Sequence, residues 1–109
     1  MNILFVCSKN KWRSRTAETV FKNAVNHTVK SAGTSRSARV KLNENHLNWA
    51  DLVFAMEEKH LQIIEQKFRS NSFNDKIIVL DIPDNYKYMD EDLILTLKAS
   101  VANFVEDLV

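Results

Sequence analysis

The stretch ILFVCSKNKWRSRTAETVF, residues 3–21, changes its pattern twice. Ile3–Val6 is a continuous apolar run of β-forming residues, as expected for a strand buried on both faces. The run ends at Cys7, the only cysteine in the chain. After a polar loop the apolar residues recur at helical spacing, which predicts a helix over residues 14–26. A strand, a charged loop and a helix therefore open the protein.

The rest of the chain continues this alternation. Further apolar runs predict strands, and amphipathic patterns predict helices, with a surface loop at 69–75. The predicted strands cover 29–32, 52–56 and 77–80, and the predicted helices cover 44–49, 57–68 and 90–108. Strands that alternate with helices indicate parallel βαβ units. We expect one α/β domain over residues 1–109, with a four-stranded parallel sheet between helices in three layers.

Composition excludes several classes of protein. The net charge of +1 over 109 residues gives no general attraction to nucleic acid or to a membrane surface. A single cysteine excludes an internal disulfide framework and a cysteine-rich zinc site, and it fits a reducing cytoplasm. A single glycine, Gly33, also excludes the glycine-rich phosphate motifs of nucleotide-binding proteins.

Three unusual loops follow predicted strands. They are the Cys7 loop, Gly33–Thr34 and Asp81–Asp84. Ligands of open parallel sheets bind beyond the carboxyl ends of the strands, so these loops should meet at one edge.

The first loop has the composition of an anion site. The amides at the start of the following helix and the helix dipole attract an anion, and the fork of Arg13 suits two phosphate oxygens. The same donors favour a thiolate at Cys7, which could attack a bound phosphoryl group without a metal or another cofactor. The plainer alternative is a small buried cysteine that ends a strand.

The sequence here resembles a known family. Cys7, Arg13 and Ser14 give the C-x5-R-S/T signature of low-molecular-weight protein tyrosine phosphatases, and Asn10 matches the loop asparagine of that family. Further matches over most of the chain are SAGT at 31–34, ADLVFAME at 50–57 and IPDNY at 82–86. The chain is most similar to a compact bacterial subgroup, because the region 34–42 is shorter than in typical members. The resemblance implies the phosphotyrosine phosphatase I-like fold.

The resemblance also implies catalytic roles. Cys7 would be the nucleophile, Arg13 the phosphate clamp, and Asp84 the general acid that later acts as base. Asn10 and Ser14 would hold the loop and the thiolate by hydrogen bonds. The remaining candidates would bind substrate or support the site from outside it. The candidates for substrate binding are Ser8, Lys9, Lys11, Trp12 and Tyr86, together with Asn10 and Ser14, and the supporting residues are Ser31 and Asp81.

Some positions depart from the family pattern. Lys9 stands where members usually have glycine, so a positive φ there would strain the loop. Trp12 replaces a second cysteine, and it could stack on an aromatic substrate or pack against a helix. Asn85 replaces the proline that usually follows the acid. This weakens the case for Asp84 and leaves Asp81 as the alternative acid.

These observations favour a cysteine-dependent phosphatase that hydrolyses phosphomonoesters through a phosphocysteine. Its expected partner is a phosphotyrosine protein or a small phosphomonoester, without nucleic acid or membrane, and phosphate or sulfate should occupy the loop. One alternative is a phosphate- or phosphopeptide-binding module with little turnover. Arsenate reduction on the same scaffold fits less well, because it passes a disulfide among several cysteines. We interpret His27, His46 and His60 as surface or helix-end residues.

Overall fold

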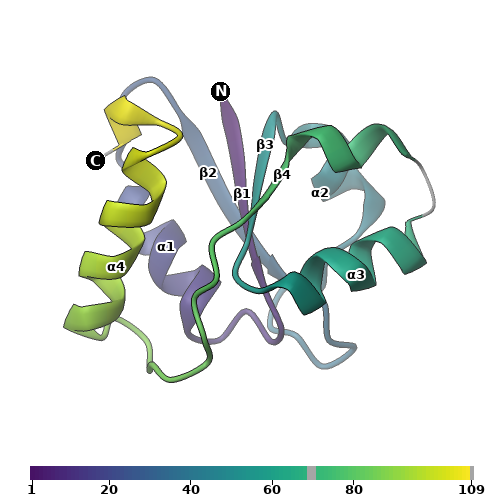
Figure 1. Cartoon of the computed structure of the whole chain (residues 1–109), viewed down its shortest axis with the longest axis horizontal. Helices are drawn as coiled ribbons and strands as arrows, with labels where there is room; N and C mark the ends of the chain where they lie inside the picture. The colour runs from purple at the N-terminus through teal and green to yellow at the C-terminus, as the bar shows by residue number, and fades with distance from the viewer. Residues whose placement is uncertain (69–70, 109) are drawn as a thin grey trace.

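A computed structural model describes residues 1–68 and 71–108 of the chain. Its centre is a parallel sheet with strand order β2-β1-β3-β4 (Figure 1). The strands are β1 (Asn2–Cys7), β2 (Thr28–Gly33), β3 (Leu52–Ala55) and β4 (Ile77–Val79). The predicted four-stranded parallel sheet is confirmed.

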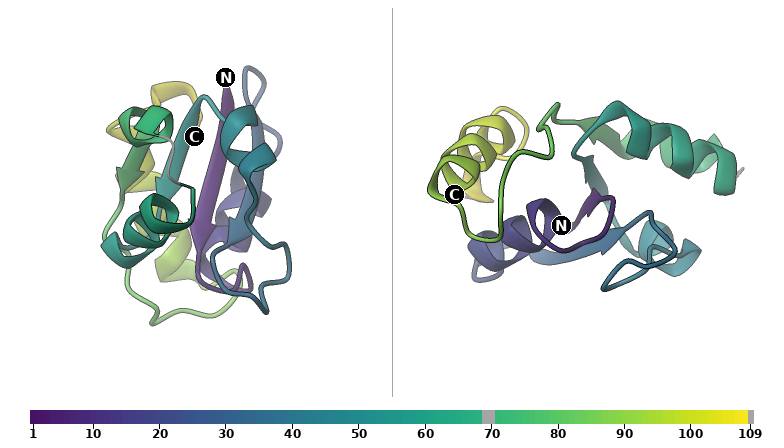
Figure 2. Two further views of the ribbon diagram at one scale, coloured as in Figure 1. Left: turned by 90° about the vertical axis from the view of Figure 1, so that its right-hand side faces the viewer. Right: turned by 90° about the horizontal axis from the view of Figure 1, so that it is seen from below.

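Helices cover both faces of this sheet, which gives the three predicted layers (Figure 2). The helices are α1 (Arg13–Phe21), α2 (Glu44–Trp49), α3 (Glu58–Lys67) and α4 (Glu91–Ala102), with short 3-10 helices η1 (Asn71–Lys76) and η2 (Glu106–Leu108). Helices α1 and α4 pack on one face, and α2 and α3 on the other. Within the described ranges, no helix combines the length and apolarity needed to cross a membrane.

Strand β1 is apolar throughout because both of its faces are covered. Ile3, Phe5 and Cys7 point toward the α1 and α4 layer, while Leu4 and Val6 point toward the α2 and α3 layer. Phe5 stacks between Phe21 of α1 and Phe54 of β3, with ring centroids 5.7 and 5.3 Å away. Strand β1 therefore carries its carboxyl end, and Cys7, to a fixed position.

Three details differ from the sequence-based expectations. Helix α1 ends at Phe21 rather than at residue 26, because the chain turns there, and Val25 is 95% exposed. Residues 71–75 belong to η1 instead of a surface loop, with Phe73 buried in the core; residues 69 and 70 lie outside the described residues. Phe104 lies beyond the end of α4 and is half exposed, although its ring still contacts that of Phe54.

Gly33 is required by close packing and not by its φ angle, which is not positive. A Cβ at this position would lie 2.5 Å from the Ser8 carbonyl oxygen, 2.9 Å from the Asn10 amide nitrogen and 2.7 Å from the Ala38 Cβ. Two of these atoms belong to the backbone of the Cys7 loop. The missing side chain of Gly33 thus lets the end of β2 approach this loop.

We predict that Gly33→Ala displaces the Cys7 loop, because backbone atoms at these distances cannot yield as a side-chain end can. The unfolding free energy should fall by about 1–3 kcal/mol, the usual range for overpacking. Urea denaturation measures this change, with Ser37→Ala, at an exposed residue of the segment that follows Gly33, as the control. Wild-type stability of Gly33→Ala would contradict the close approach.

Candidate active site

Hydrogen bonds from a neighbouring segment fix the shape of the loop that follows Cys7, Ser8–Trp12, from its outer side. The segment Thr34–Arg39 donates four hydrogen bonds to loop carbonyls. Three come from backbone amides, namely Thr34 to Cys7 (2.9 Å), Ser35 to Ser8 (2.8 Å) and Arg39 to Lys9 (2.9 Å), and the fourth from Arg39 Nε to Asn10 (3.1 Å). In a trans peptide the N–H points opposite to the C=O. The amides that follow these carbonyls therefore face the inside of the loop, where they can bind an anion.

The sulfur of Cys7 lies at the base of this loop beside a hydroxyl. The Ser14 Oγ is 3.0 Å from Cys7 Sγ, and it accepts a hydrogen bond of 2.7 Å from Asn10 Nδ2. The Ser14 hydroxyl hydrogen can therefore point to the sulfur, which is closer than its other neighbour, the Ala32 carbonyl oxygen at 3.5 Å. A hydrogen bond donated to sulfur stabilises the negative thiolate.

Asn10 supports the loop from inside the protein. It is fully buried, and its Nδ2 donates to Ser31 Oγ (2.8 Å) as well as to Ser14. Ser31 in turn donates to the Glu18 carboxylate. The φ of Asn10 is 56°, in the left-handed region that asparagine tolerates. Within the loop Ser8–Trp12 the positive φ thus falls at Asn10 and not at Lys9, so the strain expected at Lys9 is absent.

Arg13 is almost completely buried, with 2% of its surface exposed. Its Nη1 donates to Glu57 Oε1 (2.5 Å) and to the Ile82 carbonyl oxygen (2.9 Å), and its Nε lies 3.6 Å from Asp84 Oδ1. Burial opposes the charge of Glu57, but hydrogen bonding to Arg13 and the nearby cations outweigh it and lower the pKa of Glu57. The guanidinium is therefore held in a fixed position in the pocket wall, with Glu57 as its counter-charge.

His60 connects α3 to the same loop. Its Nδ1 accepts the Glu57 amide (3.0 Å) and its Nε2 lies 2.9 Å from Ser8 Oγ. The ring is fully buried, so the expectation of a surface residue is wrong, although His60 does lie in the first turn of its helix. Burial, followed by the charge of Arg13, lowers the pKa of His60 to about 4. The imidazole is neutral near pH 7.

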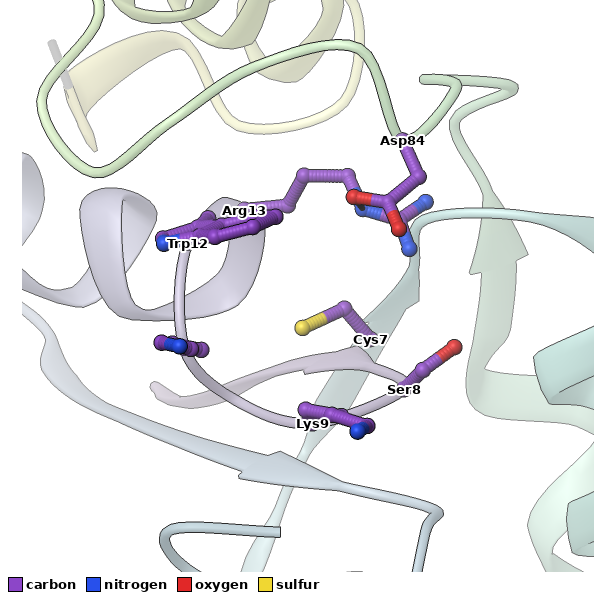
Figure 3. Close-up of a pocket in the computed structure, with 7 residues that line it drawn as sticks. Cys7, Ser8, Lys9, Trp12, Arg13 and Asp84 are labelled. Atoms are coloured by element: carbon purple, nitrogen blue, oxygen red, sulfur yellow. Dashed lines mark ion pairs between the residues drawn. The ribbon is translucent and has the colours of Figure 1, made fainter.

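These elements surround a pocket of about 300 Å³ (Figure 3). The Cys7 sulfur lies at its centre, and Asp84 and the Arg13 side chain lie above it in this view. The lining residues are Cys7, Ser8, Lys9, Lys11, Trp12, Arg13 and Asp84. A thiol, a guanidinium and a carboxyl group thus face one cavity of a size that holds a phosphoryl group.

Comparisons with known proteins agree with this arrangement. A family model described as low molecular weight phosphotyrosine protein phosphatase matches residues 2–44. The protein-arginine-phosphatase of Bacillus subtilis (strain 168) is 33% identical, in a match that covers 73% of this chain and 70% of that protein. The chain belongs to the low molecular weight phosphotyrosine protein phosphatase family.

Two solved structures of similar proteins extend this result. A low molecular weight phosphotyrosine phosphatase from Vibrio cholerae O395 has a TM-score of 0.80 at 17% identity, over 97% of this chain and 95% of that one, which shows the shared fold. The YwlE arginine phosphatase has a TM-score of 0.65 at 26% identity, over 99% and 91%; that structure is a cysteine-to-serine mutant with a phosphorylated active-site serine. Cysteine-dependent phosphatase chemistry is therefore the activity of this family.

Two predicted site residues lie elsewhere. Tyr86 is half-buried and packs on the core beside α4 instead of lining the pocket. Asp81 is exposed, has a φ of 56°, and lines a neighbouring hollow with Pro83 and the first residues of α3. Asp84 is thus the aspartate of this loop that faces Cys7.

Sequence analysis missed Glu57 and His60. Glu57 follows directly after the third apolar strand, so its position at the carboxyl edge of the sheet was the available signal. A charged residue there faces the same site as Arg13. His60 lies one helical turn later and gave no separate signal.

We predict a pH-dependent stability from His60. Its pKa is 6.5 when unfolded and about 4 when folded, so the unfolded state binds more protons as the pH falls through this interval. Neutral, buried His60 should therefore make its full contribution to the free energy of unfolding above pH 6.5. The free energy of unfolding should then fall by about 2–3 kcal/mol as the pH is lowered to 4.5. Urea denaturation of the wild type and of His60→Asn checks this result. An equal pH dependence in both proteins would contradict it.

Proposed function

We propose that this protein hydrolyses phosphotyrosine in proteins through a covalent phosphocysteine at Cys7. The observation that carries the proposal is the placement of the Cys7 sulfur at the base of a loop with inward amides, in the same pocket as Arg13 and Asp84. Amides and a guanidinium neutralise the equatorial oxygens of a phosphoryl group, which leaves the sulfur in line with phosphorus. The family membership supports the same chemistry.

In the first step the Cys7 thiolate attacks phosphorus. The S–P bond forms while the bond from phosphorus to the tyrosine oxygen breaks, and the protonated carboxyl of Asp84 gives its proton to that oxygen. Asp84 is about half exposed at the mouth of the pocket, where a leaving group would depart. Transfer of this proton prevents the build-up of charge on the leaving oxygen.

In the second step water attacks the phosphocysteine. The Asp84 carboxylate accepts a proton from water as the O–P bond forms, and the S–P bond breaks to return the thiolate of Cys7 and free phosphate. The phosphorylated serine in the YwlE mutant supports an intermediate of this kind, because the serine there replaces a cysteine. The hydrogen bond from the Ser14 hydroxyl stabilises the thiolate that forms when the S–P bond breaks.

The rim of the pocket favours an aromatic and uncharged substrate side chain. Lys9 and Lys11 are exposed at the rim, and the Lys11 Nζ lies 5.2 Å from the Trp12 ring centroid. The Trp12 ring can contact a tyrosine ring edge to face. A phosphoarginine would instead bring its guanidinium group close to these lysines, which disfavours it. Phosphoarginine is still a second candidate, because the similar Bacillus subtilis protein is a protein-arginine-phosphatase.

We predict that a phosphotyrosine peptide gives a kcat/KM about tenfold or more above that of the matched phosphoarginine peptide. Lys11→Gln removes one rim charge that repels the guanidinium of phosphoarginine, so the ratio of the two kcat/KM values should fall. A change of about 1.4 kcal/mol in this repulsion would alter the ratio tenfold. Phosphate release from the two peptides, measured at low salt, tests this. A higher kcat/KM for phosphoarginine would assign the chain to the second candidate.

We predict that Cys7→Ser abolishes turnover of an aryl phosphate, whereas Asp84→Asn lowers it about 10²- to 10⁴-fold, the usual contribution of a general acid. Asp81→Asn is the control, because Asp81 faces the neighbouring hollow. Rapid-quench assays for a leaving-group burst report turnover and the intermediate together.

Each outcome of these assays separates the candidates. Tight binding of phosphate with no burst and no turnover in the wild type would favour a phosphate-binding module. A larger loss in Asp81→Asn than in Asp84→Asn would transfer the role of the acid to Asp81.

A further inference from the structure

Two helices of this protein begin with the same four-residue pattern. Glu44-Asn45-His46-Leu47 opens α2 and Glu58-Lys59-His60-Leu61 opens α3. In both helices a backbone amide before the first turn donates to the histidine Nδ1, at 3.1 Å for His46 and 3.0 Å for His60. Because Nδ1 accepts a hydrogen bond in each case, it carries no proton of its own.

The two histidines differ at the other ring nitrogen. The Nε2 of His60 lies 2.9 Å from Ser8 Oγ, and the His60 ring is fully buried. His46 lies on α2, none of whose residues lines the pocket. The shared capping geometry is therefore present in both helices, while contact with the Cys7 loop belongs to His60.

The direction of the contact from His60 to Ser8 follows from its chemistry. A neutral imidazole carries one proton, and since Nδ1 is an acceptor this proton is on Nε2. His60 therefore donates to Ser8 Oγ. Ser8 is one of the residues that line the pocket, and in Figure 3 its Oγ points away from the Cys7 sulfur. The bond from His60 therefore holds Ser8 from the side of the loop that faces away from the sulfur.

The first turn of α3 thus holds both ends of the loop. His60 binds Ser8, the residue after Cys7. Glu57, the N-cap residue of the same helix, binds Arg13, the residue at which α1 begins. Each contact joins residues more than forty positions apart, 52 for His60 with Ser8 and 44 for Glu57 with Arg13. The geometry of the loop therefore depends on α3 as well as on the local chain.

We propose that His60 is a positioning residue for phosphoryl binding: its hydrogen bond to the Ser8 hydroxyl holds Ser8 in place, so that the Ser8 backbone amide faces a phosphoryl oxygen in the pocket. This inference rests on the proposed phosphatase function. It assigns to the Ser8 side chain the task of fixing this backbone amide, without a contact of its own with the substrate. His60 itself does not touch the substrate.

Two substitutions distinguish the roles of the two ring nitrogens of His60. In His60→Asn the amide oxygen takes the place of Nδ1 and preserves the cap, but the side chain does not reach Ser8. In His60→Gln the amide nitrogen takes the place of Nε2 and can donate to Ser8. We expect His60→Asn to lower kcat/KM for an aryl phosphate about three- to tenfold, as for the loss of one hydrogen bond. His60→Gln should recover most of this loss.

A double-variant comparison tests whether His60 acts through Ser8. Ser8→Ala should cause the same fall in kcat/KM and the same weakening of inhibition by inorganic phosphate. His60→Asn added to Ser8→Ala should cause little further loss. His46→Asn, the matched control, changes the equivalent cap of α2 and should leave kcat/KM at the wild-type value.

The contrary results are distinct. Losses that add in the double variant, or a His60→Gln protein as impaired as His60→Asn, would show a merely structural role for His60. If His60→Asn does not fold, wild-type kcat/KM and phosphate inhibition in Ser8→Ala would still overturn the proposal. An inactive wild type would refute the proposed function itself, which these variants do not address.

Discussion

The burial of the Arg13 guanidinium is the constraint on which the site depends. A charge removed from water is costly unless an opposite charge and hydrogen-bond acceptors surround it. Glu57 supplies the charge from the end of β3, and the Ile82 carbonyl supplies an acceptor from the segment after β4. Arg13 itself begins α1. One side chain thus joins the loops that follow three strands of the sheet.

The shape of the Cys7 loop depends on a second contact, made from outside. Thr34–Arg39 satisfies successive loop carbonyls and so turns the intervening amides inward. Gly33 permits this contact because its missing side chain leaves room for the loop backbone. The segment Thr34–Arg39 therefore has a structural task in this protein. Arg39 contributes to it through Asn10, and also lies 3.9 Å from Glu18.

Charge is distributed unequally around the pocket. Lys9 and Lys11 lie on the rim formed by the loop, whereas Asp84 approaches from the segment after β4. Under the proposed function, an incoming phosphoryl group would meet these cations and its leaving group would meet the Asp84 carboxyl. This separation of charge suits phosphoryl transfer by positioned charges and a nucleophile.

The sequence by itself determined the α/β alternation, the strand and helix on either side of the Cys7 loop, and the spacing of Cys7 to Arg13. These features depend on local periodicity and on residues within one short segment. Tertiary structure decided which residues complete the site. Glu57 and His60 reach the loop only because parallel strands end at the same edge of the sheet, and Asp84 rather than Asp81 faces Cys7 because the backbone turns between them. Such contacts join residues far apart in the chain, so no local pattern encodes them.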